Sequence, residues 1–247
     1  MKIFQGYHLI NNLRQTNMSD NQTKTGNSIF ESAECFRGLY PEELEKLTDS
    51  KTRVHYLKGE TIFKQGAFSP HVTYVLSGLV RVYLQTGHNR QLNIRLAAPG
   101  DFLSFSSVFG EATYNYSALA VKDSWVCMIE KNALRNLLQT NADFALRIVS
   151  RNCRNEQQLL DIIGNLSYKQ MRGKLASALF YLSSESFLKE QVFQYLTRQD
   201  ISDFAAISTE STIKFLKEFE KEGIIDLKKK DIEIKDWKKL EIISRNS

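Results

Sequence analysis

The sequence predicts an α+β protein with an antiparallel β-domain first, a long helix next and a helix-turn-helix near its end. Between residues 53 and 129, short apolar or alternating runs are separated by Gly-containing turns, which is typical of a sandwich or barrel. Between residues 141 and 165, apolar residues recur in steps of three and four, as they do on a helix. Between residues 197 and 222, two short helical segments flank a brief break, which is typical of a helix-turn-helix.

Length and composition indicate a globular protein. The 247 residues suffice for one large domain or two modest ones, and 42% are hydrophobic while 25% are charged. No apolar run approaches the roughly 20 residues that span a bilayer, and residues 1–13 lack the apolar stretch and cleavage site of a signal peptide. We therefore expect a cytoplasmic protein with no membrane partner. Residues 1–28 are polar and predict a flexible tail, with Met1 and Met18 both open as the start of translation.

The cysteines and histidines do not predict a metal centre. Cys35, Cys127 and Cys153 are far apart and form no C-x-x-C pair, and the four histidines are scattered without helical ligand spacing. We expect Cys127 and Cys153 to be small core residues, because free cysteine is commonly buried. The sequence also holds no P-loop and no pairing of a nucleophile with a base, so we do not expect an enzyme.

The β-domain is expected to follow a short helix that begins at Pro41, where acidic residues sit in the first turn. Turn signals such as Ser77-Gly78 and Pro99-Gly100 separate the apolar runs. The strands expected from these runs are Val54–Leu57, Thr61–Phe63, Val72–Leu76, Leu79–Leu84, Leu92–Ala97 and Ser124–Ile129.

The helical segment 141–165 carries two apolar stripes. One has the spacing of a coiled-coil seam, interrupted by a glutamate, and we assign to this dimer seam Leu146, Val149, Cys153, Glu156, Leu160 and Ile163. The simpler alternative is a core helix that packs on the β-domain. A second stripe, which could pack there, comprises Phe144, Ile148, Leu159 and Ile162. Because two stripes leave one for a partner, we favour a homodimer. A further helix is expected over Tyr168–Ser183.

The C-terminal segment predicts a helix-turn-helix. Thr197 and Asp200 resemble a capping box, Ala206-Ile207 provides the break, and Ser208 can cap a second helix that ends before Gly223. On that second helix a polar stripe, confined to about one sixth of the circumference, comprises Glu210, Lys214, Lys217 and Lys221. Such a stripe suits a major groove, although Glu210 and Lys214 could equally form an ordinary i,i+4 surface pair.

Two alternating runs after the second helix predict a β-hairpin with Lys228, Lys229 and Lys230 at its tip, where lysines can reach phosphates. The formal net charge of the chain is +5 and its pI is near 9.0, which is compatible with a polyanionic partner. Residues 197–247, however, contain 11 Lys+Arg and 11 Asp+Glu and so carry no net charge. DNA binding must therefore depend on where the cations lie.

At this point the ordered motifs of the chain resemble those of the Crp/Fnr family of bacterial regulators. Gly59–Gly66 is similar to the family's G-E-x-[IL]-F-x-x-G, Tyr74–Tyr83 to its Y-x-[IV]-x-x-G-x-[VI]-[RK]-[VL]-[YF], and Pro99–Phe102 to its P-G-[DE]-[FI]. Thr197–Ile201 and Ser208–Lys214 resemble its T-R-[QE]-[DE]-[IL] and S-x-E-T-[VI]-x-R. The resemblance covers about residues 36–234, nearly all of the chain after the tail.

The resemblance implies a double-stranded β-helix (jelly-roll) effector domain over 29–140, a dimerisation helix over 141–165 and a winged helix-turn-helix over 166–247. It implies base contacts by Glu210 and Lys214, with Thr209 and Ser211 flanking them and Ser208 at the helix start. Thr197, Arg198 and Gln199 match the family's phosphate-contacting helix start. Lys214 replaces the family's usual Arg, which keeps the charge but loses the bidentate fork.

The effector site departs further from the family pattern. Members that bind cyclic AMP carry G-E after the P-G-[DE] turn and R-S before the next strand, where this chain has Ser104-Phe105 and Tyr116-Ser117. The family's hydroxyl pair on the long helix appears as Leu159-Leu160. We therefore expect no binding of cyclic AMP, because the groups that engage its ribose and phosphate are missing. These positions fill the cavity or line an apolar ligand site, and we favour filling.

No cofactor is expected. Iron–sulfur members of the family place several cysteines near the N-terminus, where this chain has only Cys35, and no axial haem ligand can be named. The sequence thus predicts a homodimeric regulator of transcription that binds double-stranded DNA at pseudo-palindromic sites, with RNA polymerase and an unidentified small-molecule effector as further candidate partners. The alternative is a small-molecule sensor whose winged domain binds a protein.

Overall fold

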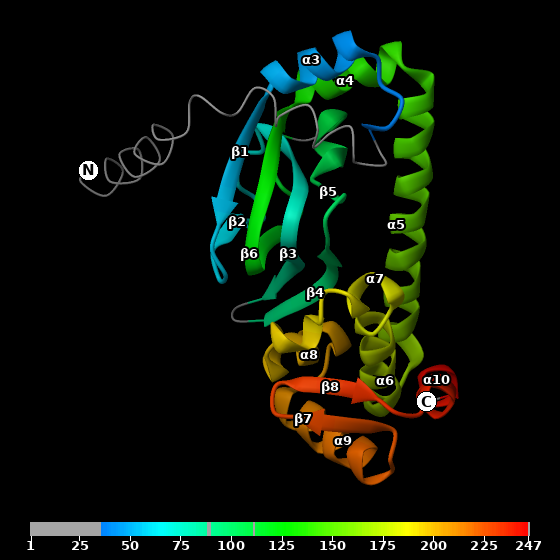
Figure 1. Ribbon diagram of the computed structural model, residues 1–247. Coiled ribbons are helices and arrows are strands. Elements are labelled where there is room, and N and C mark those ends of the chain that lie inside the picture. The colour runs from blue at the N-terminus through cyan, green and yellow to red at the C-terminus, as the bar shows by residue number, and fades with distance from the viewer. Residues whose placement is uncertain (1–35, 88–89, 111, 247) are drawn as a thin grey trace, which may run out of the picture.

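The computed structural model describes residues 36–87, 90–110 and 112–246, so the predicted tail over 1–28 lies outside the described residues. Figure 1 shows an N-terminal β-domain above a smaller C-terminal domain, with the long helix α5 running down one side of the molecule. The first α-helix within the described residues, α3 (Pro41–Asp49), begins at Pro41 as expected, and Glu43 accepts a hydrogen bond from the amide of Tyr40 at 2.8 Å.

The β-domain is one antiparallel sheet of six strands whose main path runs β1-β6-β3-β4, with β2 paired to β6 and β5 to β3. One hydrophobic cluster fills the interior of the roll, and a second lies between the opposite face and helices α3, α4 and α5. The strands are β1 (Lys51–Tyr56), β2 (Thr61–Phe63), β3 (His71–Gly87), β4 (Arg90–Ala97), β5 (Phe102–Leu103) and β6 (Ser117–Glu130), with a short 3-10 helix η2 at Phe105–Val108.

The expectation of a turn at Ser77-Gly78 is wrong, because β3 runs through both residues as a single 17-residue strand. The pairing of β3 with β6 shifts register around Ser77 and Leu79, and Gly78 has a φ of 92°. This bulge reverses the alternation of side chains. Before it Tyr74 faces the helices, whereas beyond it Leu79 packs against the C-terminal domain and Val80 enters the interior of the roll.

Helix α4 (Lys131–Thr140) leads into α5 (Ala142–Tyr168), whose first turn is capped by the Asn141 side chain. At 1.5 Å per residue, the 27 residues of α5 span about 40 Å. Its N-terminal half packs on the β-domain through buried Phe144 and Ile148, but Leu159 from the same predicted stripe is 45% exposed. The expectation that Leu159 packs on the β-domain within one protomer is therefore wrong.

The C-terminal domain begins with α6 (Met171–Leu182), three residues later than expected, because Tyr168 ends α5. It continues with α7 (Glu185–Leu188), the 3-10 helix η3 (Val192–Gln194), α8 (Arg198–Ala205) and α9 (Thr209–Lys221). The hairpin of β7 (Ile225–Lys228) and β8 (Asp231–Ile234) follows, and α10 (Trp237–Asn246) closes the domain by packing on α6. No described helix is long and apolar enough to cross a membrane.

Candidate nucleic-acid interface

Helices α8 and α9 form the helix-turn-helix, and local hydrogen bonds set both starts. The Thr197 hydroxyl accepts from the Asp200 amide at 3.0 Å, while Asp200 accepts from the Thr197 amide at 2.8 Å, which completes the predicted capping box. Ala206 ends α8 in the left-handed region with a φ of 51°. The Ser208 hydroxyl accepts from the Ser211 amide at 3.1 Å and so caps α9 as predicted.

The predicted DNA-facing stripe of α9 is open to solvent. Thr212, Leu216 and Phe219 bury the opposite side of the helix in the core of the C-terminal domain. The side chains that remain exposed include all four of the stripe: Glu210, Lys214, Lys217 and Lys221. Because the buried side anchors α9, a groove could receive the stripe without any rearrangement of the domain core.

The hairpin carries lysines whose ion pairs divide them into two groups. Lys228 and Lys235 both contact Glu233, and this pairing lowers the pKa of the Glu233 carboxyl to about 2. Lys229 and Lys230 have no ion-pair partner among the described residues, and Lys229 turns the hairpin with a φ of 52°. The tip of the hairpin thus presents two uncompensated cations.

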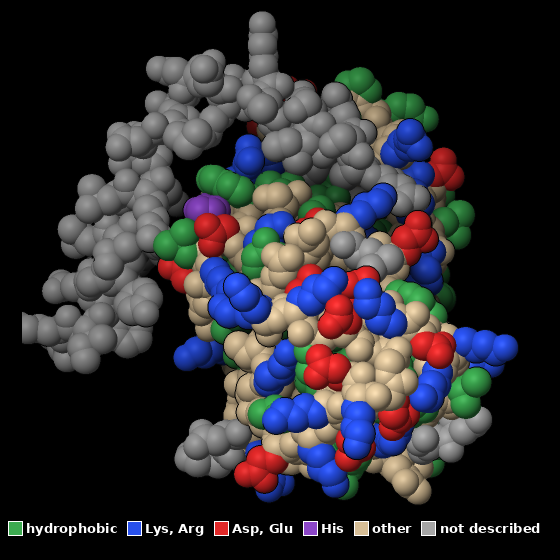
Figure 2. Space-filling view, turned by 60° about the horizontal axis from the view of Figure 1, so that its bottom comes forward, with side chains coloured by type: hydrophobic (Ala, Val, Ile, Leu, Met, Phe, Trp, Pro, Cys, Tyr) green, Lys and Arg blue, Asp and Glu red, His purple; other side chains and the backbone are tan. Residues whose placement is uncertain are grey.

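Ion pairs also neutralise the far end of α9. Arg172 of α6 binds Glu222 at 2.7 Å and Lys239 of α10 binds it at 3.3 Å, and these cations lower the pKa of Glu222. Figure 2 shows Lys and Arg side chains interspersed with Asp and Glu over the C-terminal domain. Lys217 and Lys221, by contrast, have no ion-pair partner in the part of the chain that the structure describes. The zero net charge of residues 197–247 therefore conceals a local excess of cations on the exposed stripe of α9 and at the hairpin tip.

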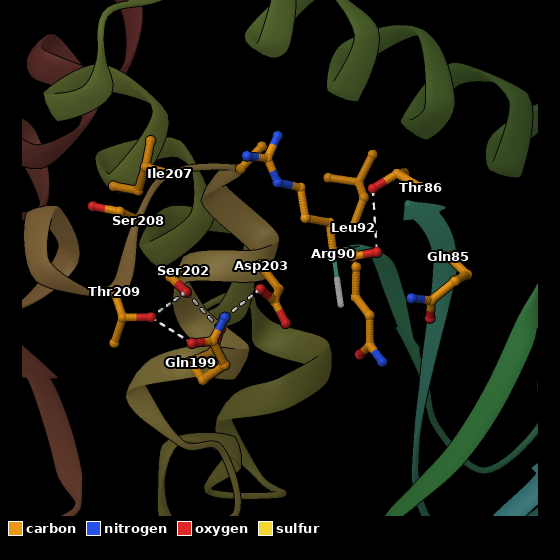
Figure 3. A pocket seen from close by; sticks show the side chains of 12 residues that line it. Gln85, Thr86, Arg90, Leu92, Gln199, Ser202, Asp203, Ile207, Ser208 and Thr209 are labelled. Atoms are coloured by element: carbon orange, nitrogen blue, oxygen red, sulfur yellow. Dashed lines mark hydrogen bonds between the residues drawn. The ribbon is translucent and has the colours of Figure 1, made fainter. Parts of the chain in front are cut away.

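The structure brings Gln199 of α8 and Thr209 of α9 together across the turn. Thr209 donates a short hydrogen bond to the Gln199 side chain, which in turn donates to Asp203 at 2.7 Å. Figure 3 shows these side chains on one wall of a hollow of about 1000 Å³, with Thr86 and Arg90 of the β3–β4 hairpin on the other. Ser208 lines the same hollow, whereas Arg198 is half-buried.

Contacts with the β-domain hold the helix-turn-helix in this orientation. Asn93 of β4 donates to the Asp200 carbonyl at 2.9 Å, and the Leu96 amide donates to the Tyr181 hydroxyl at 3.0 Å. The hydrophobic core of the C-terminal domain includes Leu79, Leu96 and Val121 of the β-domain. Because β4 is an edge strand, the C-terminal domain also covers an edge that would otherwise be open.

The predicted effector positions do not form one pocket within a protomer. Phe105 packs against Phe102 on the helix-covered face of the sheet, with ring centroids 5.1 Å apart. Tyr116 lies at the interior of the roll, where its hydroxyl accepts from the Ser104 amide at 2.5 Å. The Ser117 hydroxyl accepts from the Gln65 amide at 2.9 Å. Leu159 and Leu160 are exposed on α5.

The predicted dimer seam lies open along α5. Its apolar side chains are 56% to 66% exposed: Leu146, Val149, Leu160 and Ile163. Glu156 and Cys153 are exposed as well. The expectation that Cys153 is a small core residue is therefore wrong, because the helix turns it away from the β-domain, whereas Cys127 is buried in the sheet as expected.

Two features of the C-terminal domain were not expected from the sequence. One is α10, although Asp236 at its start and the spacing of Leu240 and Ile243 are signals that could have revealed it. The other is the ion pair between Arg81 of β3 and Asp200 of α8, which joins residues 119 positions apart. No local pattern could have revealed that contact.

Comparison with known proteins agrees with this architecture. The family model "Cyclic nucleotide-binding domain" matches residues 53–141, and "Crp-like helix-turn-helix domain" matches residues 173–243. The CRP-like cAMP-activated global transcriptional regulator of Mycobacterium tuberculosis is 24% identical over 219 residues, which cover 86% of this chain and 96% of that protein. Electron transport regulator A of Shewanella oneidensis is 26% identical over 85% of each chain.

Solved structures share the fold. FixK2 from Bradyrhizobium japonicum superposes with a TM-score of 0.67 at 18% identity, over 80% of this chain and 98% of that one. A cyclic nucleotide-binding-like domain followed by a Crp-like helix-turn-helix defines a DNA-binding transcription regulator. The chain belongs to the Crp/Fnr family.

Proposed function

We propose that this protein regulates transcription as a homodimer that binds pseudo-palindromic promoter DNA, with an effector domain that does not respond to cyclic AMP. The observation that carries the proposal is the pairing of two open surfaces in one chain. The stripe of α9 faces solvent with the shape and charge of a groove-reading helix, and the seam of α5 exposes an apolar row that a second copy would cover. The proposal includes RNA polymerase as a further partner, which the DNA-bound dimer would contact at the promoter.

The two kinds of DNA contact can be separated by mutation. Lys214→Ala should relax base preference at one position of each half-site, at about 1–3 kcal/mol per position, because this lysine lies on the base-reading stripe. Lys229→Ala should weaken all sequences alike, because the hairpin tip reaches phosphates. In vitro selection from random duplexes, followed by dissociation constants on single-base variants, measures both. Equal losses of DNA affinity in both variants on every sequence would contradict the assignment. If the wild-type protein enriches no duplex at all, a protein partner for the winged domain becomes the favoured interpretation.

The dimer seam can be tested through the native Cys153. In a parallel coiled coil, equivalent seam residues face each other across the two-fold axis. The proposed dimer should therefore bring the two copies of Cys153 within the 4.4–6.8 Å between Cα atoms that a disulfide needs. In a Cys35→Ser background, oxidation by copper phenanthroline should yield a covalent dimer on a non-reducing gel. The added change Cys153→Ser should abolish it, because burial raises the pKa of the remaining Cys127 thiol to about 12. A covalent dimer that survives Cys153→Ser would place the interface elsewhere.

The effector proposal predicts a negative titration. The chain lacks the family's ribose-binding Glu and phosphate-binding Arg, and each charge-assisted hydrogen bond lost is worth roughly 1.5–3 kcal/mol. Tyr116 and Phe63 pack with ring centroids 5.8 Å apart at the interior of the roll, which supports a filled site. Calorimetry with cyclic AMP should show no heat of binding in a preparation that binds DNA, and micromolar affinity would overturn this part of the proposal.

A further inference from the structure

Arg81 is the only charged residue that is buried within the described part of the chain, with 8% of its surface exposed. It lies on β3, beyond the bulge at Gly78 that turns Leu79 and Arg81 toward the C-terminal domain. Its Nη1 atom lies 2.7 Å from Asp200 and 3.8 Å from Asp203, both on α8, and 3.4 Å from the Asn93 side chain. The Tyr83 ring covers the guanidinium with its centroid 4.9 Å from Cζ. Arg81 thus links the effector sheet to the first helix of the helix-turn-helix, in addition to the hydrogen bond from Asn93 to the Asp200 carbonyl.

The carboxylate of Asp200 has two roles that use different oxygens. Oδ2 accepts from the Thr197 amide and hydroxyl at 2.8 and 2.7 Å and so sets the start of α8. Oδ1 receives Arg81. Because Thr197, Arg198 and Gln199 form the helix start that matches the family's phosphate contacts, the position of that start depends directly on the effector sheet.

Stability alone does not require such a buried cation. Well-packed apolar residues often stabilise a protein as much as a buried ion pair does, or more, whereas an ion pair selects one geometry. The shared core around Leu79 and Leu96 already supplies apolar burial between the two domains. What Arg81 adds is a directional contact, since the ion-pair partners of its guanidinium lie on α8 and its hydrogen-bond partner Asn93 lies on β4. The docking leaves the α9 stripe and the hairpin tip exposed, so it is compatible with bound DNA.

We propose that Arg81 is a positioning residue that holds the helix-turn-helix at a fixed orientation on the effector domain, so that the two copies in a dimer match one spacing of half-sites. This inference rests on the proposed function. Two half-sites must lie about 34–36 Å apart along one face of the duplex, and two inserted base pairs rotate one of them by about 70°. A helix-turn-helix that Arg81 holds in place cannot turn to meet the rotated half-site, whereas one that has lost the Arg81 contact can.

The test compares Arg81→Glu with a matched control, Arg53→Glu, which makes the same charge change at an exposed residue of β1, at the other edge of the sheet. Duplexes selected by the wild-type protein are prepared at native spacing, with two base pairs inserted, and with one half-site scrambled. Wild-type protein and Arg53→Glu should bind native spacing at least about tenfold more tightly than the expanded duplex. In Arg81→Glu, the ratio of the affinity for native spacing to that for the expanded duplex should fall to about threefold or less. Its affinity for the duplex with one scrambled half-site should equal that of the wild-type protein. Arg81→Lys should restore part of the ratio.

A second measurement follows the docking itself. Amide hydrogen exchange in β4, where the Leu96 amide bonds to Tyr181, should accelerate in Arg81→Glu and stay unchanged in Arg53→Glu. Exchange in α9 should stay unchanged in both variants, which shows that the domain remains folded. If Arg81→Glu fails to fold, Arg81→Met, which removes the charge without reversing it, takes its place.

Each other outcome overturns the proposal. If the spacing ratio of Arg81→Glu is unchanged, Arg81 does not position the domain. If Arg81→Glu loses affinity equally for the half-site and the full duplexes, Arg81 supports only the helix-turn-helix fold. Tighter binding by Arg81→Glu means that docking opposes DNA binding. Failure of the wild-type protein to bind any selected duplex would instead contradict the proposed function, so the two failures are distinguishable.

Discussion

Gly78→Ala is expected to lower the free energy of unfolding by about 4 kcal/mol. A Cβ atom at this position would lie 2.2 Å from the Ser124 hydroxyl and 2.5 Å from the Asp123 carbonyl oxygen, so backbone must move. Overpacking of this kind costs about 1–3 kcal/mol, and the φ of 92° adds roughly 1–3 kcal/mol for any residue other than glycine. Urea denaturation of the purified variant measures the sum.

Two other glycines serve as controls for this prediction. Gly66 has a φ of 79° but open space around its Cβ position, so Gly66→Ala isolates the backbone strain at about 1–3 kcal/mol. Gly87 has open space and no positive φ, so Gly87→Ala should stay within about 0.5 kcal/mol of the wild type. If Gly78→Ala costs no more than Gly66→Ala, the close approach of β6 is unimportant and the bulge is not held by packing.

The second large effect is the salt dependence of DNA binding. Arg198 and Lys229 are assigned to phosphates above, and we expect Lys217 and Lys221, further along the α9 stripe, to lie near phosphates as well. With four such cations in each protomer, a dimer would neutralise about eight phosphates. Counterion release then predicts a slope of about −7 in log K against log salt, and affinity should fall about 10⁴-fold between 50 and 200 mM. Fluorescence anisotropy across a salt series gives the slope directly.

Matched variants test which cations contribute to that slope. Lys221→Gln removes two cations per dimer and should reduce the slope by about two, whereas Lys46→Gln, on the distant helix α3, should leave it unchanged. A slope near zero in the wild-type protein would mean that phosphates are not contacted. Equal changes in both variants would mean that net charge, and not placement, governs binding.

The helix-turn-helix could be predicted from the sequence because its ends are set locally. Thr197 and Ser208 lie within three residues of the amides that they cap, so the signal and the contact lie in the same short segment. The seam of α5 could be predicted for a similar reason, because the spacing of Leu146, Val149 and Ile163 defines a face of any helix. Its coverage by a second copy stays a prediction.

Other features depend on residues far apart in the chain. Ser77-Gly78 has the composition of a turn, and only the approach of β6 to within contact distance makes it a bulge in a continuous strand. Cys153 and Leu159 have the composition of core residues, yet both are exposed, because the faces of α5 that carry them do not pack on the β-domain.

The sequence by itself therefore determined the class of fold, the order of the domains and the polar stripe of α9, since each depends on periodicity or on contacts within a few residues. Tertiary structure alone decided which way Arg81 points and what it binds. Side-chain alternation along β3 would place Arg81 at the interior of the roll, but the bulge at Gly78 shifts it to the face that meets Asp200. That one-residue shift brings the Arg81 guanidinium to Asp200 of α8, and it arises from packing between strands that the local sequence does not encode.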